Sequence, residues 1–218
     1  QEVCAPLSNG SWAETTSAAP NLNIVNNLAC MAEVGTDGCG IEQPLSAGVK
    51  AITRTSQLDF MQPDHMLAVV VISDEEDCSI KNPGLFLTPE WESRQFINTA
   101  CNYPESNETN YLFDAAYFHD KLVAAKGGRE DAVVFAAVVG VPNVDSSCQG
   151  AGDQLAGCLE NPAMQLIPQE FVDPSLGAPY THFAPACTRQ NSAGVDITVA
   201  RPGRRFVETA REFGSEGY

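Results

Sequence analysis

Four consecutive carboxylates are the residues of this sequence best placed to do chemistry. The run Asp74-Glu75-Glu76-Asp77 follows closely on an apolar stretch that ends at Ile72. Crowded carboxylates raise the energy of their ionised forms unless a cation or a helix N-terminus offsets the charge. Mg²⁺ and Ca²⁺ both take oxygen ligands. The run therefore predicts a site for one of these cations with Asp74 as a ligand, while the three residues after it cap a helix or face water.

The elements that must position these carboxylates follow from the hydrophobic pattern. Two continuous apolar runs, 66–72 and 132–139, each indicate a strand that is buried on both faces. A helical pattern at about residues 111–126 lies between them. Strand, helix, strand is typical of α/β proteins, so we expect an open, mainly parallel sheet flanked by helices. Ligands of such sheets bind beyond the carboxyl ends of the strands, where the acidic run lies.

Three further helices are expected. Apolar residues at helical spacing predict a short amphipathic helix within residues 22–35. A second helix has Pro44 in its first turn, where the missing N–H is no loss, and continues to about residue 52. A last helix spans residues 204–213 and ends at Gly214, which suits a left-handed C-cap.

The chain is expected to form a single domain over residues 1–218. Residues 1–21 lack periodicity and indicate an extended lead-in. Residues 79–110 and 141–203 are expected to be loop-rich insertions that disulfides would rigidify. The sequence has neither an initial Met nor an export signal, and it stops where another strand would follow. We therefore expect a processed or partial chain.

Eight cysteines indicate disulfide bonds. Their number is even and no CxxC pair occurs, so the usual spacing of zinc sites and thioredoxin-like motifs is missing. The sequence leaves the connectivity open, although nearness favours Cys30 with Cys39 and Cys78 with Cys101. Disulfides persist in oxidising compartments, so we expect a secreted, cell-surface or periplasmic protein.

The charge of the chain narrows the class of partner. Its 28 acidic and 12 basic residues give a formal net charge of −16, which repels nucleic-acid phosphates and anionic lipid headgroups. No run approaches the roughly 18 apolar residues that a membrane helix needs. We therefore expect a protein partner or assembly subunits, with no nucleic acid and no direct membrane insertion.

Two loops resemble the metal-ion-dependent adhesion site of von Willebrand factor A-type domains. Gly35-Thr36 precedes a helix, and Val70-Val71-Ile72-Ser73-Asp74 ends a strand. The wider pattern is similar to secreted or lipid-anchored bacterial von Willebrand A-like proteins, strongly over 25–80 and more loosely over 120–140 and 200–218. The motifs are Leu28-Ala29-Cys30, Gly38-Cys39-Gly40, Glu42-Gln43-Pro44-Leu45, Asp74-Glu75-Glu76-Asp77-Cys78-Ser79 and Arg201-Pro202-Gly203-Arg204-Arg205-Phe206-Val207.

This resemblance implies a metal-dependent binding site. Thr36 would lend its hydroxyl to Mg²⁺ or Ca²⁺, and Asp74 would bind the cation directly or through water. One coordination position would remain for a carboxylate of the partner. Such domains bind proteins and do not transform them, so the resemblance implies adhesion or assembly and no enzymatic activity.

The first metal loop of the family, Asp-x-Ser-x-Ser at the end of a strand, is absent. The nearest candidates, Asp145-Ser146-Ser147 and Asp173-Pro174-Ser175, do not follow a predicted strand. A flanking segment outside this sequence would complete the site, or another polypeptide would, or the site is degenerate and the domain structural. The first explanation is favoured, because the expected final strand is also missing.

Two other functions remain open. A structural subunit of an extracellular assembly would need no metal. A metal-dependent hydrolase would use the acidic run with a base such as His65 or His182, although each histidine, His119 included, is better explained as a surface or boundary residue. Aromatic side chains in predicted loops would either anchor a partner or fill gaps beneath the loops: Trp12, Trp91, Tyr103, Tyr111 and Tyr180.

Overall fold

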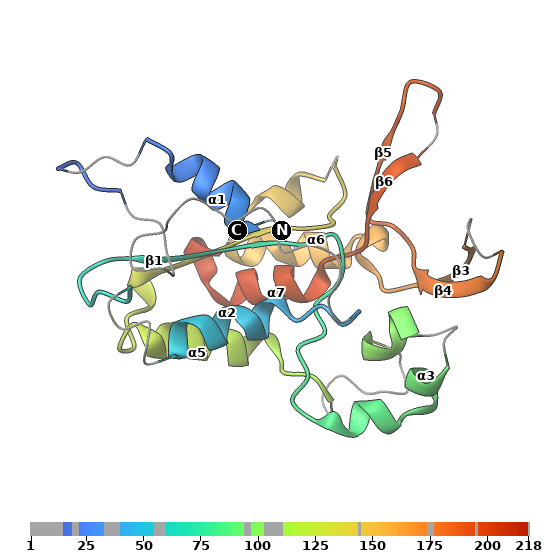
Figure 1. Cartoon of the computed structure of the whole chain (residues 1–218), viewed down its shortest axis with the longest axis horizontal. Helices are drawn as coiled ribbons and strands as arrows, with labels where there is room; N and C mark the ends of the chain where they lie inside the picture. Colours follow the sequence, from blue (N-terminus) through green and yellow to red (C-terminus); the bar gives the residue numbers. More distant parts are fainter. Residues whose placement is uncertain are drawn as a thin grey trace. The chain divides into compact units, whose positions relative to one another are not determined.

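The computed structural model (Figure 1) contains two compact units, Gln1–Gly40 and Ile41–Tyr218. The first unit contains α1 (Ile24–Ala32), which confirms the first predicted helix. The second unit contains the acidic run and everything described below. The structure describes residues 15–18, 22–32, 40–54, 60–93, 97–102, 111–143, 145–173, 177–194 and 196–217.

Two parallel strands form the centre of the second unit. β1 (Leu67–Ile72) pairs with β2 (Val133–Val138), with Val71 opposite Ala137. α5 (Ala115–Ala125) lies between them in the chain. The predicted strand–helix–strand order is therefore confirmed, and the fold mixes helices with strands. Each sheet among the described residues has two strands, so a wider open sheet is not observed.

Three helices cover one face of this strand pair. They are α2 (Pro44–Thr53), α5 and α7 (Arg204–Glu212), and Figure 1 shows them on the same side of β1. α5 packs against both α2 and α7, while α2 contacts β1 and α7 contacts β2. Apolar side chains of both layers form the main core: Leu45, Val49, Leu67, Val71, Phe118, Leu122, Val133, Phe135, Phe206 and Val207.

The ends of these helices follow local sequence signals. α2 has Pro44 at its first position, as predicted. α5 begins later than predicted, because the Asp114 side chain caps it by accepting a hydrogen bond from the Tyr117 backbone N–H at 2.9 Å. After α7, Gly214 has a φ of 57°, which confirms the predicted left-handed C-cap.

The other face of the strand pair is exposed, so the prediction of strands buried on both faces is wrong. Val70 is 61 % exposed, Ile72 73 % and Val138 61 %. Successive side chains of a strand point to opposite faces, and α2, α5 and α7 cover the face of Leu67, Val71 and Phe135. We call the exposed surface the open face; it consists of Ala68, Val70, Ile72, Ala136 and Val138.

Two antiparallel ribbons occupy part of the predicted loop region 141–203. β3 (Pro168–Val172) pairs with β4 (Pro179–Phe183), and β5 (Cys187–Gln190) pairs with β6 (Asp196–Ala200). β5 and β6 extend away from α2, α5 and α7 in Figure 1, whereas β4 contacts the short helix η3 (Ile97–Asn102). Most of their residues are exposed, so their sequences carry little apolar alternation and indicate loops.

Short helices fill most of the remaining predicted loops. They lie in both insertions, at the entry to β2 and at the end of α7. Their bounds are η2 (Pro83–Leu87), α3 (Pro89–Glu92), η3 (Ile97–Asn102), η5 (Glu130–Ala132), η6 (Ser146–Gln149), η7 (Gly152–Gln154), α6 (Leu155–Glu160), η8 (Pro162–Met164) and η9 (Gly214–Glu216).

Disulfides brace the two insertions. Cys78 bonds to Cys101, as nearness in sequence predicts, and Cys148 bonds to Cys158. The first bond ties η3 to the segment after β1, and the second links η6 to α6. The prediction of disulfides within the two insertions is therefore confirmed, but both segments also contribute to a hydrophobic core: Cys78 belongs to the small cluster with Leu85 and Leu112, and Cys158 to the main one.

The other cysteines differ in state. Cys30 is disulfide-bonded, but its predicted partner Cys39 lies outside the described residues. Cys187 in β5 is a free thiol. The disulfides are consistent with an oxidising compartment. Across the described part of the chain, no helix is both long and apolar enough to cross a membrane.

Gly140 brings the end of β2 against the chain just before α7. It bridges to Pro202, and its carbonyl accepts a hydrogen bond from the Gly203 N–H at 2.9 Å. A Cβ on Gly140 would lie 1.8 Å from the Arg201 carbonyl oxygen, so only glycine fits. This close backbone approach fixes where α7 starts relative to β2.

We expect Gly140→Ala to lower the free energy of unfolding by about 2 kcal/mol, because the backbone must shift to admit the methyl group. Gly48→Ala is the matched control: nothing lies within 4 Å of a Cβ at that position in α2, so alanine should stabilise the protein by about 1 kcal/mol. Urea unfolding followed by circular dichroism measures both. Equal stability of the two variants would contradict the role given to Gly140.

Candidate functional site

The candidate site is the segment that leaves the carboxyl end of β1. The Ser73 N–H still donates to the Val138 carbonyl at 3.1 Å, so the strand pairing continues to that residue. The Asp74 carbonyl then accepts from the Arg201 N–H at 2.8 Å, which ties the segment to the chain before α7. From Glu75 to Asp77 the backbone turns into the protein, and the carboxylates become progressively more buried.

Glu76 caps α7. Its side chain accepts hydrogen bonds from the backbone N–H of Arg205, with its two oxygens 3.1 and 3.2 Å from that nitrogen. One oxygen also accepts from the Asp77 N–H at 2.9 Å. The local N-cap residue, Gly203, offers no side chain for this purpose. A carboxylate from elsewhere in the chain therefore satisfies the free N–H groups and the positive end of this helix.

Asp77 does the same for α2. Its carboxylate is fully buried and accepts from the Leu45 N–H at 3.1 Å. It also accepts from the Ser79 hydroxyl and N–H, each at 2.9 Å, and the Ser79 hydroxyl oxygen in turn accepts from the Ser46 N–H at 3.0 Å. The local cap residue Gln43 makes no side-chain capping bond. Two neighbouring carboxylates thus hold the N-termini of two different helices.

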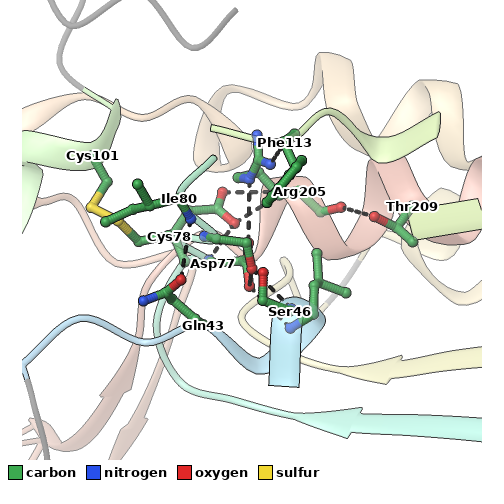
Figure 2. A network of polar contacts seen from close by, with 12 residues as sticks. Gln43, Ser46, Asp77, Cys78, Ile80, Cys101, Phe113, Arg205 and Thr209 are labelled. Atoms are coloured by element: carbon green, nitrogen blue, oxygen red, sulfur yellow. Dashed lines mark hydrogen bonds and ion pairs between the residues drawn. A yellow bond between two sulfur atoms is a disulfide. The ribbon is translucent and has the colours of Figure 1, made fainter. Parts of the chain in front are cut away.

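Arg205 places its positive charge beside Asp77 (Figure 2). Its Nε lies 3.6 Å from an Asp77 oxygen, and both side chains are almost completely buried. Its guanidinium also donates to the Phe113 carbonyl. A buried ionised carboxylate is tolerated only if it is paired and hydrogen-bonded, and Asp77 meets both conditions.

The segment that follows β1 is also anchored to the two residues that precede α2. The Cys78 N–H donates to the Glu42 carbonyl at 2.7 Å, and the Ile80 N–H donates to the Gln43 side-chain oxygen at 3.2 Å. Ile80 also bridges to Leu112. Cys78, Leu85 and Leu112 form a second, small core here, which the Cys78–Cys101 disulfide adjoins.

Burial sets the protonation behaviour of the two capping residues. Burial raises the pKa of Glu76 to about 8, although Arg205 and the N–H donors act in the opposite direction. Burial also raises the pKa of Asp77 above its usual value, against the effect of Arg205 and of its hydrogen bonds. Because burial shifts the pKa values of both carboxyl groups in the folded protein, their protonation is coupled to folding.

Glu75 points to a different partner. One of its oxygens lies 3.5 Å from Nε2 of His182, and the hydrogen bond to this side chain lowers the pKa of Glu75. Nδ1 of the same ring accepts from the Phe183 N–H at 2.8 Å, which assigns the remaining ring hydrogen to Nε2. The carbonyl of Phe183 accepts a hydrogen bond from the guanidinium of the buried Arg201. The same guanidinium lies over the Phe171 ring, with its carbon 4.8 Å from the ring centroid.

Asp74 is the one exposed carboxylate of the run. It takes part in no ion pair among the described residues. Its carboxylate acts electrostatically on Glu42, whose pKa is raised by burial and then by the charges of Glu75 and Asp74. The carboxyl end of β1 thus presents an acidic surface, which we define as Glu42, Asp74 and Glu75.

The predicted metal ligands can be located only in part. Thr36 lies outside the described residues, so its distance from Asp74 is not part of the structure. Within the described ranges, no group of three or more His, Cys, Asp or Glu side chains is arranged to hold a metal ion. Glu76 and Asp77 are committed to helix N-termini, and Glu75 to His182. The described residues therefore do not form a cation site by themselves.

The other sequence candidates lie apart from the acidic surface. His65 precedes β1 and so lies at the opposite end of the strand from the carboxylates. His119 packs on the Phe213 ring, with centroids 4.8 Å apart. Neither histidine is positioned to act on these carboxylates. Of the three, only His182 meets the run.

The described loop aromatics fill gaps. Trp91 packs edge-on against Phe86 at 4.8 Å, Tyr180 stacks on Phe171 at 5.6 Å, and Tyr111 packs on the small core. All three side chains are half-buried. Trp12 and Tyr103 lie outside the described residues.

Sequence reasoning missed Arg205 and Ser79, although both stand in motifs quoted for the family resemblance. Arg205 looks like a surface helix residue in a polar stretch. One signal in the sequence pointed to this network. Neither α2 nor α7 is preceded by a residue whose side chain caps it, while the acidic run supplies carboxylates that can accept hydrogen bonds from free N–H groups.

Comparison of the chain with protein-family models, with curated proteins and with solved structures finds no match. The fold and the site define the chain as a disulfide-bonded protein of mixed helix and strand with a parallel β–α–β unit. Because no comparison supplies a family, a narrower classification has to be argued from the residues of this chain.

Replacing Arg205 should destabilise the protein strongly. Arg205→Met leaves Asp77 buried without its cation, and we expect the free energy of unfolding to fall by about 3 kcal/mol or more. Arg204→Met is the control, because the neighbouring arginine is partly exposed; it pairs with Glu208 on the same helix and donates one hydrogen bond to the Leu159 carbonyl, so its loss should cost about 1 kcal/mol. Denaturant unfolding of both variants measures the difference, and similar losses would refute the role of Arg205.

Glu76 should make stability fall as the pH rises. Its folded pKa of about 8 exceeds its ordinary value of 4.5, so its stabilising contribution is complete below 4.5 and is lost as the pH rises toward 8. Glu76→Gln keeps an acceptor oxygen and cannot ionise. We expect the melting temperature of this variant relative to wild type to increase steadily between pH 5 and pH 8.

Asp145→Asn is the control for this titration. Hydrogen bonds from Ser147 and Asn161, neither of which titrates, lower the pKa of Asp145, so its contribution is present above its ordinary value of 3.8 and is lost only at lower pH. The melting temperature of Asp145→Asn relative to wild type should therefore stay constant between pH 5 and pH 8. A constant difference for Glu76→Gln would show that Glu76 is ionised in the folded protein throughout.

Proposed function

We propose that this chain is a protein-binding or assembly module of an extracellular or periplasmic protein, of the von Willebrand factor A-like class. Its binding surface lies at the carboxyl ends of β1 and β2. The observation that carries the proposal is the exposed Asp74 at this edge of a parallel strand pair, where such sheets bind their ligands.

The division of labour among the four carboxylates supports this assignment. Glu76 and Asp77 serve the fold, because both cap helices from buried positions. Asp74 has no such task in the described structure and faces solvent. A carboxylate that the fold does not use, beside Glu42 and Glu75, is available to a cation or to a basic group of a partner.

A divalent cation is part of the proposal. Asp74 and Thr36 would hold Mg²⁺ or Ca²⁺, because both are oxygen donors. The cation would then take a carboxylate of the partner and so turn an acidic surface into one that binds acidic groups. Since the described residues provide one free carboxylate, the remaining ligands would come from residues outside the described ranges or from the partner.

Two other functions are weaker candidates. A structural subunit without metal would use the exposed ribbons and the open face for assembly and would not depend on Asp74. A metal-dependent hydrolase would need a base beside the acidic run. His182 is adjacent, but its Nδ1 accepts a backbone hydrogen bond and its Nε2 faces Glu75, so neither nitrogen is directed at a substrate.

Calorimetric titration tests the metal site. Mg²⁺ or Ca²⁺ added to the chelator-treated protein should give a binding heat that disappears in Asp74→Asn, because the ion loses its charged ligand. Asp64→Asn, which removes an exposed carboxylate at the other end of β1, should bind as wild type does. A heat that survives Asp74→Asn, or no heat with either ion, would contradict the metal site and favour a metal-free assembly module.

A further inference from the structure

Two cationic side chains meet where the turn before β1 lies against the end of α5. The Lys126 ammonium donates to the Gln62 carbonyl at 2.7 Å and to the Pro63 carbonyl at 3.4 Å. The Arg129 guanidinium donates to the same Pro63 carbonyl. Lys126 is the C-cap residue of α5 and is only 7 % exposed, so its charge is held in a fixed place.

The charges of these two side chains are not balanced by an acidic side chain in the described part of the chain. Nζ of Lys126 and Nη2 of Arg129 contact one oxygen, at 3.4 and 2.5 Å, so they lie within about 6 Å of each other and repel. Neither takes part in an ion pair among the described residues. The carbonyl oxygens and the negative end of α5 offset the repulsion only with partial charges. An anion bound beside both cations would offset it with a full charge.

A cavity of about 450 Å³ adjoins both cations. Its lining includes the apolar residues Met61, Pro63 and Ala125 beside Lys126 and Arg129. Met61 also packs against the main core, which places the cavity on the side of the strand pair that the helices cover. Cavities of this size with an apolar lining and a few charged groups are typical of small-molecule sites.

Asp64 limits the charge that the cavity can accept. It lines the cavity as well, but its side chain is exposed and makes no ion pair with Lys126 or Arg129. Two cations and one carboxylate leave an excess of one positive charge, which matches a single carboxylate better than a phosphate of higher charge. The apolar part of the lining suits a hydrocarbon group attached to that carboxylate.

We infer that this cavity binds a small organic acid, with its carboxylate between Lys126 and Arg129 and its hydrocarbon part against the apolar lining. Each cation retains N–H donors beyond those given to the two carbonyls, because an ammonium has three and a guanidinium five. The carboxylate therefore adds charge-assisted hydrogen bonds without breaking the contacts that hold the turn. The site precedes β1, at the opposite end of the strand from Asp74, and it is independent of the proposed function.

Titration with sodium hexanoate tests the chemistry of the ligand. The backbone amide signals of Gly127 and Gly128, next to Lys126, report binding in NMR spectra recorded at constant ionic strength. We expect saturable shifts with a Kd of about 1 mM. Hexanol has a hydrocarbon part without a charge, and inorganic phosphate has charge without a hydrocarbon part. Each should bind more weakly than hexanoate by about fivefold or more.

Protein variants test the charges that line the cavity. Lys126→Met and Arg129→Met should each weaken hexanoate binding by about tenfold or more, because each removes one charge-assisted partner. Asp64→Asn should tighten binding by about threefold, because it removes a repelling charge. Lys121→Met is the matched control. This exposed lysine of the same helix lies over the Tyr117 ring at 5.4 Å and does not line the cavity, so its loss should leave binding unchanged.

A purely structural role for the two cations predicts a different result: the Met variants would lose stability, and hexanoate would shift no signal. The inference is overturned if no saturable shift occurs at about 20 mM hexanoate, if hexanol or phosphate binds as tightly, or if Arg129→Met binds as Lys121→Met does. Circular dichroism verifies folding, and Arg129→Met and Asp64→Asn decide the matter if Lys126→Met does not fold. Asp74→Asn should leave hexanoate binding unchanged, so a failed metal titration does not bear on this site.

Discussion

The capping of two helices by two adjacent carboxylates is the interaction on which the rest of the second unit depends. Glu76 holds the N-terminus of α7 and Asp77 holds that of α2, while the Arg205 side chain pairs with Asp77. The helices lack side-chain caps of their own, so these carboxylates satisfy buried N–H groups that would otherwise be unpaired. Since α2 and α7 both pack on the β1–β2 pair, the same network fixes the end of β1 against the helical layer.

This network also explains the form of the acidic surface. Once the last two carboxylates of the run turn inward, Asp74 remains outside at the point where the chain leaves the strand. The exposure of Glu75 is intermediate: its side chain is half-buried and lies beside His182. A run of like charges that would be unstable on one surface is thus distributed over three environments, and only the first is open to a ligand.

The helical layer covers one face of the strand pair and leaves the other exposed. Val70 and Ile72 are exposed on that face, and among the described residues the edge of β1 beside them has no strand partner. Two features that are costly in isolation, exposed apolar side chains and unpaired strand edges, occur here together. Their combination supports the proposed protein-binding role more directly than the alternative of catalysis, because neither feature contributes a reactive group.

The sequence by itself determined the elements whose signals are local: the apolar runs of β1 and β2, the proline-initiated α2 and the left-handed turn at Gly214. It also indicated Cys78–Cys101 from nearness. Only the tertiary structure decided which carboxylates are free, because the partners of Asp77 and Glu76 lie 32 and 129 residues away along the chain. The open face was equally beyond the sequence, since an apolar run specifies a strand but not how many of its faces other elements cover.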